Sequence, residues 1–377
     1  MHSAKYCAPS KANEKGTCFT HAALRKMAKA WNVEHPHSPI SMGTNTKKHK
    51  LWNVLRKKMV TLTDSNCTDD YCILDTPLVK KIQDPDLHQN TFRPKMPRDW
   101  VKNPKSWLST TDIQKVLEQY LVSKPELEFI GPVPIDFDKT VSFGQCIVNE
   151  LCNIDLHTLY NQGKRYVGVV FNLDPHDMPG SHWVSLFVNM YNGGIYFFDS
   201  VGKFPTGEIA TLMSRLRKQG NSLIHSGKIQ FDEVHDEHAL YYPVKRVKGH
   251  RVQVNRESPY YRQSQVPSYL RGMIMRLHTD KGHHGMDVIH QTGKHHVHVE
   301  NIDSIEDGHH DGIAVVKGFR LFYNDIAHQL KNTECGMYSI HFIDSLLHGT
   351  SFKEFTEQIQ RDGPMNRKRK IYYRPST

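Results

Sequence analysis

A cysteine that opens an apolar stretch is the residue of this chain best suited to nucleophilic chemistry. Cys335 begins the run CGMYSIHF, and Gln329 stands six residues before it. Far upstream, His182 begins the run HWVSLFVNM, and Asp199 ends the next apolar run seventeen residues later. Thiol, imidazole, carboxylate and amide are the nucleophile, base, orienting acid and oxyanion donor of covalent acyl chemistry. Their order, His–Asp–Gln–Cys, predicts a cysteine hydrolase.

The expected place of each group explains how the set would work. A helix that begins at Cys335 directs its partial positive charge at the sulfur, which favours the thiolate. Histidine exchanges protons near neutrality, so His182 suits the base. The YNGG turn between the two apolar runs predicts a hairpin that returns Asp199 to His182. Gln329 can donate an amide N–H to an oxyanion, and one such donor typically contributes about 3–4 kcal/mol.

Each residue also has an ordinary structural interpretation. Taken singly, Asp199 suits a turn, Gln329 a solvated loop, and Cys335 a small buried packing position. The conjunction of all four types at this spacing favours a catalytic site. A papain-like order, with Cys146 or Cys152 ahead of the histidine, is the competing arrangement. Both of these cysteines lie in the apolar stretch FGQCIVNELCNIDL, which indicates buried packing.

Composition limits the class of protein. The 377 residues, 38% of them hydrophobic, allow one to three globular domains. The N-terminus lacks the apolar run of a signal peptide, and no stretch approaches the roughly 18 apolar residues of a membrane span. Seven scattered cysteines favour free thiols in a reducing compartment over a disulfide framework. The net charge of +10, without a base-reading motif, indicates solubility or weak attraction to nucleic acid or acidic assemblies.

Hydrophobic periodicity predicts an α+β fold with a mixed sheet flanked by helices. A continuous apolar strand is expected at 165–173, followed by the hairpin that joins His182 to Asp199. Residues 80–105, rich in Pro, Asp and Lys, have the composition of a linker. Helices are expected at 20–31 with Thr20 as cap, 51–60, 107–121 with Thr110 or Thr111 as cap, 146–159, 208–218, and from Cys335 to Gly349.

These motifs resemble a known family. The pattern His-Trp, Phe-Asp-Ser and Gln-x5-Cys-Gly is similar to the ubiquitin-like-protein-specific (SUMO) proteases and the adenovirus endopeptidase. The runs WLSTTDIQKVLEQY, GPVPIDFD, VVFNLDPHDMPGSHWVSLF and YFFDSVGKFP resemble more closely the polyprotein-processing proteases of large nucleocytoplasmic DNA viruses, the African swine fever virus protease group. The similarity covers roughly 107–231 and 321–355.

The resemblance implies a papain-like-superfamily cysteine-protease core with the nucleophile at a helix N-terminus. The catalytic residues that it assigns are His182, Asp199, Gln329 and Cys335. It also implies that Trp107 and Trp183 sandwich a narrow tunnel, next to Gly336, that admits only glycine before the scissile bond. Core packing is an equally weighted alternative for both tryptophans. Neither a cofactor nor a metal ligand is implied.

We expect a helical N-terminal arm region at 1–100 and a catalytic domain at 101–377. The catalytic domain carries a His-rich insertion at about 229–318, whose alternating Val-rich pieces predict a small β-rich subdomain. Nine of the 25 histidines lie between His278 and His310. A zinc site or a pH sensor is one interpretation of this cluster, and a solvated insertion is the favoured one.

The function inferred from the sequence is a thiol endopeptidase that cleaves after Gly-Gly motifs and processes viral structural polyproteins during particle maturation. The expected location is the host cytoplasm, at the viral factory, and the virion, without secretion. The expected partners are a polypeptide with Gly-Gly-X sites and, weakly, nucleic acid or an acidic assembly, but no membrane. Alternatives are a deconjugating protease for host ubiquitin-like modifiers, an acyltransferase, and an inactive groove-binding scaffold. The intact four-residue set disfavours the scaffold.

Overall fold

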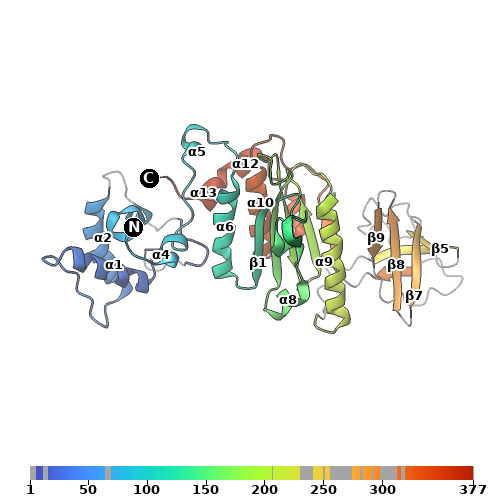
Figure 1. Ribbon diagram of the computed structural model, residues 1–377, viewed down its shortest axis with the longest axis horizontal. Helices are drawn as coiled ribbons and strands as arrows, with labels where there is room; N and C mark the ends of the chain where they lie inside the picture. Colours follow the sequence, from blue (N-terminus) through green and yellow to red (C-terminus); the bar gives the residue numbers. More distant parts are fainter. Residues whose placement is uncertain are drawn as a thin grey trace.

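A five-stranded mixed sheet forms the centre of the molecule (Figure 1). This computed structural model describes residues 6–11, 16–63, 69–205, 207–229, 241–248, 251–254, 274–280, 283–290, 293–297, 312–315 and 319–376. The strands lie in the order β1-β2-β3-β4-β11. Their bounds are Leu127–Pro134 (β1), Tyr166–Asn172 (β2), Trp183–Asn189 (β3), Gly194–Phe198 (β4) and Arg320–Tyr323 (β11).

The strand directions place one end of every strand at the same edge of this sheet. β1 is parallel to β2, β11 is parallel to β4, and β3 is antiparallel to both β2 and β4. The C-terminal ends of β1, β2, β4 and β11 therefore meet the N-terminal end of β3. Phe198 stands opposite Ser185, so Asp199 lies at the edge where His182 leads into β3. The predicted hairpin is confirmed.

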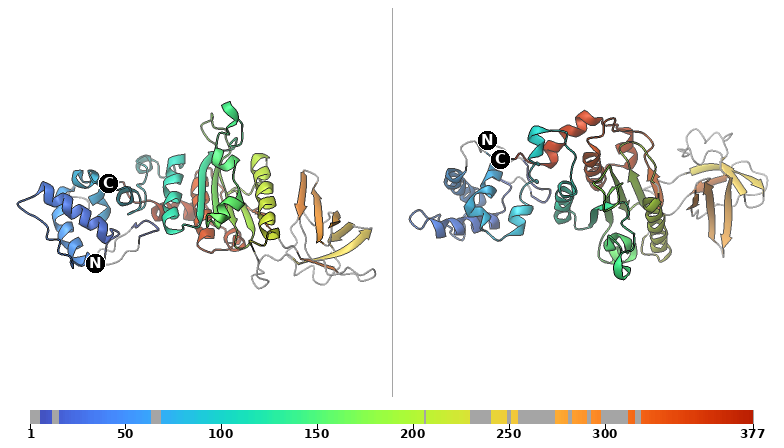
Figure 2. Two further views of the ribbon diagram at one scale, coloured as in Figure 1. Left: turned by 60° about the horizontal axis from the view of Figure 1, so that its bottom comes forward. Right: turned by 45° about the horizontal axis from the view of Figure 1, so that its top comes forward.

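Helices cover both faces of the sheet (Figures 1 and 2). α6 (Thr110–Ser123) and α10 (Cys335–Leu347) lie on one face, and α8 (Leu156–Asn161) and α9 (Gly207–His225) on the other. Strand side chains alternate between the two layers: Phe187 packs with α6 and α10, whereas Leu186 packs with α9. Because both faces are covered, the five central residues of β2 are buried, as the continuous apolar run predicts.

α10 is buried on almost every side, which its apolar composition explains. The stripe predicted from the sequence is buried throughout, and it consists of Tyr338, Phe342, Ile343, Leu346 and Leu347. His348 caps the C-terminal end of the helix, and Gly349 follows it with φ +91°, a conformation that glycine adopts without strain.

Several predicted helix boundaries were wrong, and α9, expected at 208–218, continues to His225. Ser109, not Thr110 or Thr111, caps α6, because Asp112 at the third helical position completes a reciprocal capping box with it. The single helix expected at 146–159 is two short helices, α7 (Asn149–Cys152) and α8. Asp155 separates them because its side chain accepts from the backbone N–H of Thr158 and so starts α8 afresh.

The N-terminal residues form a helical region with its own apolar core. Thr20 caps α1 by accepting from the backbone N–H of Ala23, as predicted. Leu24, Met27 and Trp31 of α1 pack with the apolar side of α2. The helices here are α1 (His21–Glu34), α2 (Lys48–Met59), α3 (Pro77–Lys80), α4 (Pro85–Gln89) and α5 (Asp99–Lys102), with short 3-10 turns at Val60–Leu62 and Asp70–Asp75.

The segment expected to be a linker, 80–105, is instead bound to the rest of the chain. Gln119 of α6 donates its amide Nε2 to the carbonyl oxygens of Gln89 and Phe92, at 2.6 and 2.8 Å. The backbone N–H of Met96 donates to the carbonyl of Arg374 near the C-terminus. Its Pro-rich composition reflects irregular backbone and short capped helices rather than a free tether.

The cysteines depart from the expected free thiols. Disulfide bonds join Cys7 to Cys18 and Cys146 to Cys152, and Cys72 is also disulfide-bonded. The bonded pairs are 11 and 6 residues apart, so local turns suffice to bring their sulfurs together.

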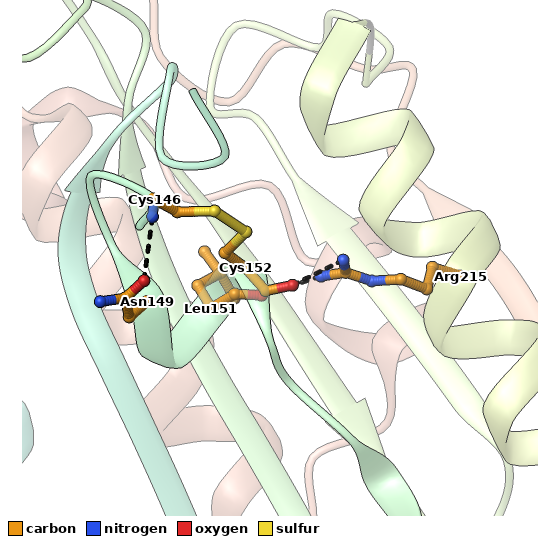
Figure 3. The surroundings of a disulfide bond; sticks show 5 residues. All are labelled: Cys146, Asn149, Leu151, Cys152 and Arg215. Carbon is orange, nitrogen blue, oxygen red and sulfur yellow. Dashed lines mark hydrogen bonds between the residues drawn. A yellow bond between two sulfur atoms is a disulfide. The ribbon is translucent and has the colours of Figure 1, made fainter. Parts of the chain in front are cut away.

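The Cys146–Cys152 loop is fastened to α9 (Figure 3). Arg215 donates from its two Nη atoms to the carbonyl oxygens of Cys152 and Leu151, at 2.7 and 2.8 Å. The backbone N–H of Cys146 donates to Asn149 Oδ1 at 2.9 Å. These two half-buried sulfurs are bonded to each other rather than packed as separate thiols, and a disulfide sulfur is not a thiolate nucleophile.

A second sheet occupies the expected β-rich insertion, in the order β10-β5-β6-β7-β8-β9. Its strands are β5 (Tyr241–Lys248), β6 (Arg251–Val254), β7 (Ile274–Asp280), β8 (His283–His290), β9 (Gly293–Val297) and β10 (Gly312–Val315). The chain ends with α11 (Phe352–Glu357), α12 (Asp362–Arg367) and α13 (Arg369–Tyr372). Among the described residues, no helix has the length and apolar character that crossing a membrane requires.

Candidate active site

The four predicted catalytic residues converge on one edge of the central sheet. His182 immediately precedes β3, Asp199 follows β4, and Cys335 is the first residue of α10, which packs against β3. Gln329 lies on the loop between β11 and α10, joined by hydrogen bonds to the residue that follows Asp199. Residues separated by as many as 153 positions in the sequence therefore share one site.

His182 and Asp199 form a close pair. His182 Nε2 lies 2.6 Å from Asp199 Oδ1, and the same oxygen accepts from the backbone N–H of Val201 at 2.9 Å. Asp199 is 1% exposed, so water competes little for its carboxylate. The pairing fixes the imidazole, because Nε2 faces the acid and Nδ1 is left for another partner.

The second partner of His182 is the thiol of Cys335. Burial lowers the pKa of His182, but its hydrogen bonds with Asp199 and Cys335 more than offset this and raise the pKa from 6.5 to about 9. The imidazole is therefore a cation at neutral pH. A cationic imidazole beside a sulfur at a helix N-terminus is the environment typical of nucleophilic cysteines. Cys335, only 2% exposed, is the free cysteine of the described residues.

The amide of Gln329 has a fixed orientation. Ser200 Oγ donates to Gln329 Oε1 at 2.8 Å, and Gln329 Nε2 donates to the carbonyl oxygen of Lys331. A carbonyl can only accept, so the Lys331 contact requires the nitrogen of the amide on that side. An amide nitrogen carries two N–H groups, so the Lys331 contact leaves one for another acceptor, and the oxyanion role of Gln329 stays a prediction.

Two residues that the sequence analysis missed hold this edge together. Asn324 is buried after β11; its Oδ1 accepts from the backbone N–H of Asp199 at 2.9 Å, and its Nδ2 donates to the Asp199 carbonyl at 2.7 Å. The Ser200 carbonyl accepts from the backbone N–H groups of His328 and Gln329, at 2.8 and 2.7 Å. Asn324 directly follows β11 and Ser200 is the second residue after β4, so a small polar residue close to a strand end was the available signal in both cases.

The two tryptophans occupy neighbouring segments with different exposure. Trp183 is 5% exposed and donates its indole Nε1 to the carbonyl of Leu108 at 3.0 Å, whereas Trp107 is 41% exposed. Gly336 lies under Leu108, where an added Cβ would be 3.0 Å from that side chain. Leu108, the residue after Trp107, therefore contacts both Trp183 and Gly336, and the predicted contacts of Trp107, Trp183 and Gly336 with substrate stay predictions.

The described ranges offer no group of three or more His, Cys, Asp or Glu side chains arranged to hold a metal ion. The histidines between His278 and His310 lie outside the described side chains. A zinc or pH-sensing role for them stays a hypothesis from the sequence.

Two viral proteins are similar to this chain over more than half of its length. A thiol protease of Acanthamoeba polyphaga mimivirus is 32% identical over 238 residues, which cover 58% of this chain and 75% of the relative. A cysteine protease of African swine fever virus is 24% identical over 211 residues, which cover 52% of this chain and 74% of the relative. No protein-family model matches the chain.

One solved structure shows the same fold. The crystal structure of the African swine fever virus protease aligns with a TM-score of 0.53, covering 100% of this chain and 98% of that chain, at 17% identity. At this identity the likeness concerns the fold alone. The predicted α+β cysteine-protease architecture is confirmed.

Proposed function

Because this chain belongs to the family of viral thiol proteases, and is therefore a cysteine protease, we propose that it cleaves polypeptides after Gly-Gly motifs and processes viral structural polyproteins during particle maturation. The observation that carries the catalytic assignment is the His182 imidazole, which has hydrogen bonds with both Asp199 and Cys335. The alignment of base, acid and thiol at one sheet edge fits covalent catalysis.

The proposed reaction has two halves, formation of a thioester on Cys335 and its hydrolysis by water, and His182 transfers a proton in each. The Cys335 thiolate attacks the carbonyl carbon before the scissile bond, and the oxyanion accepts from the Cys335 backbone N–H and Gln329 Nε2. His182 gives its proton to the departing amine, which leaves as the C–N bond breaks and a thioester remains. His182 then takes a proton from water, whose oxygen attacks the thioester carbonyl. Collapse releases the carboxylic acid and restores the thiolate–imidazolium pair.

The proposed preference for glycine is supported by the restricted access to the sulfur. Cys335 and Trp183 are almost fully buried, and the Trp183 indole is tied to the backbone of Leu108, so the wall beside the sulfur is held in place. A chain segment without a Cβ passes such a wall with the least displacement. The flat face of Trp107, which is partly exposed, is suited to pack on such a segment.

The proposed location and the proposed weak partners of the enzyme are supported by its viral relatives and by its net positive charge. Viral proteases of this family are the relatives found, and we propose that this enzyme acts at the viral factory in the host cytoplasm and in the virion. The net charge of +10 supports weak, salt-sensitive attraction to nucleic acid or an acidic assembly there.

A panel of Gly-Gly-X peptides tests the specificity. We expect Val in place of the glycine before the scissile bond to lower kcat/KM by at least about 100-fold, or ~2.7 kcal/mol. Cys335→Ala is the inactive control, and its unchanged Tm would show an intact fold. Equal kcat/KM for Gly and Val would contradict the proposal. Turnover of ubiquitin-like conjugates without turnover of peptides would favour deconjugation instead.

A further inference from the structure

A buried ion pair stands directly beside the nucleophile. Glu334, the residue before Cys335, is 1% exposed, and Arg369 of α13 is 3% exposed. Arg369 Nε donates to Glu334 Oε2 at 3.0 Å, and its Nη2 lies 3.0 Å from the same oxygen. Asn366 of α12 donates its Nδ2 to Glu334 Oε1 at 2.8 Å. The C-terminal segment thus satisfies both oxygens of this carboxylate.

The cation of the pair is also held firmly. The Arg369 guanidinium lies over the Trp100 ring, 4.2 Å from its centroid, and Trp100 packs edge-on against Tyr373. Stacked and forked contacts of this kind suit arginine rather than lysine. Trp100, Arg369 and Glu334 are therefore in continuous contact, and Glu334 is joined to Cys335 by a peptide bond.

The carboxylate of Glu334 is directed away from the helix that it precedes. Glu334 occupies the N-cap position of α10, but its side chain makes no capping hydrogen bond. A carboxylate at this position would ordinarily accept from the N–H groups of the first turn. Because the Glu334 carboxylate makes no such bond, it does not occupy the helix N-terminus, where a second negative charge would oppose one on the sulfur of Cys335.

We propose that the Glu334–Arg369 ion pair is a positioning device for the nucleophile. It fixes the residue before Cys335, neutralises a negative charge next to the sulfur, and keeps the carboxylate off the first turn of α10. The inference rests on the proposed function, because it matters for catalysis only if Cys335 is the nucleophile. Neither residue touches the reacting atoms.

Alkylation of Cys335 by iodoacetamide tests the pair without any substrate. We expect Arg369→Met to slow alkylation at neutral pH by about tenfold, or ~1.4 kcal/mol, because the carboxylate is left uncompensated. Adding Glu334→Gln to that variant should restore the rate to within about threefold of wild type, since the charge is then removed. With Gly-Gly peptides, Arg369→Met should lower kcat and leave KM nearly unchanged.

Arg374→Met is the matched control. Arg374 is a buried arginine of the same segment, 3.9 Å from Asp75 Oδ2 and stacked over Tyr71, but not in contact with Glu334. It should lower Tm without slowing alkylation. If Arg369→Met does not fold, Arg369→Lys keeps the charge and should alkylate near the wild-type rate despite a lower Tm.

Two results would overturn the proposal. One is an Arg369→Met protein that loses stability as Arg374→Met does but alkylates at the wild-type rate, which would make the pair purely structural. The other is a double variant that alkylates no faster than Arg369→Met, which would exclude the charge as the cause. Alkylation that follows the prediction in a protein that cuts no Gly-Gly peptide would contradict the proposed function and leave the pair's effect on the sulfur standing.

Discussion

The charge on His182 is the residue-scale property with the clearest consequence. Burial opposes protonation of this imidazole, yet its hydrogen bonds with Asp199 and Cys335 raise its pKa from 6.5 to about 9. A group whose pKa is higher in the folded state stabilises that state fully below its unfolded value and loses the effect as the pH rises through the folded value. The relevant window is therefore 6.5 to about 9.

We expect the wild-type protein to lose stability relative to His182→Gln across this window. A shift of this size corresponds to a change on the order of 3 kcal/mol in the difference between their free energies of unfolding. Urea denaturation at each end of the window measures it. His348→Gln, which removes an exposed histidine paired with Asp344, is the control for the substitution itself. A difference that grows with pH would contradict the assignment.

The acid and the amide of the site should differ in how much catalysis depends on them. Asp199→Asn should reduce kcat only mildly, because the new Oδ1 can still accept from His182 Nε2 and Val201 N–H. Gln329→Ala should reduce kcat by about 100-fold or more, since it removes a donor to the charge of the transition state. Steady-state kinetics on one Gly-Gly peptide compares them. The reverse ranking would show that the carboxylate's charge dominates.

At the scale of elements, the close approach of α10 to the loop before α6 sets a steric limit. An added Cβ at Gly336 would lie 3.0 Å from both Cβ and Cδ1 of Leu108 and 3.2 Å from Ile113 Cδ1. Leu108 also holds Trp183 through its carbonyl, so moving it would disturb the wall beside the nucleophile.

Gly336→Ala should therefore lower both Tm and kcat. Overpacking of this kind costs typically about 1–3 kcal/mol. Thermal unfolding and peptide kinetics measure the two effects. Gly363→Ala in α12 is the matched control, because its Cβ would meet only the end of the Arg367 side chain, at 3.8 Å. An unchanged kcat in Gly336→Ala would show that the Leu108 wall yields without cost to the site.

The elements that were predictable from the sequence are those with strong periodicity or strong local signals. The hairpin of β3 and β4, the buried strand β2 and the stripe of α10 follow from apolar pattern and from the YNGG turn. His182, Asp199 and Cys335 were predictable because each stands at an end of such an element, and Gln329 because it lies six residues before Cys335.

The features that were missed depend on contacts between distant segments. Asn324 binds the Asp199 backbone across 125 positions, and Arg369 pairs with Glu334 only because α13 packs beside α10. Neither has a local signature, because a lone Asn or Arg in an irregular stretch has many uses. The disulfides were missed for another reason. The number and spacing of the cysteines do not reveal which of them are brought together by turns of the chain.

At the scale of the whole molecule, the C-terminal segment links the N-terminal helices to the nucleophile. Arg374 exchanges backbone hydrogen bonds with Pro94 and Met96, and its guanidinium lies over Tyr71 of the N-terminal region. A few residues earlier, Arg369 binds Glu334. We propose that residues 1–100 form a region with a separate core that is nevertheless fastened to the catalytic domain at 101–377 by this segment.

The β-rich insertion leaves and re-enters the catalytic domain at neighbouring points. The chain departs after α9, where Ile229 is bonded back to Leu223. It returns at Phe319, whose backbone N–H donates to Asn221 Oδ1 of α9 at 2.8 Å and whose ring packs against Gly220. The strands β5–β10 therefore form a separate sheet beyond α9, and they add no strand to the central sheet (Figure 2).

Replacing residues 230–318 by a short linker should leave the catalytic machinery working. The two ends are already held at α9 by Asn221 and Leu223, so a short loop can close the gap at low entropic cost. We expect kcat/KM on small Gly-Gly peptides to stay within about tenfold of wild type, or ~1.4 kcal/mol, while cleavage of whole polyproteins changes. Complete loss of peptide activity in a folded deletion variant would place the insertion, with its histidines, inside the working site.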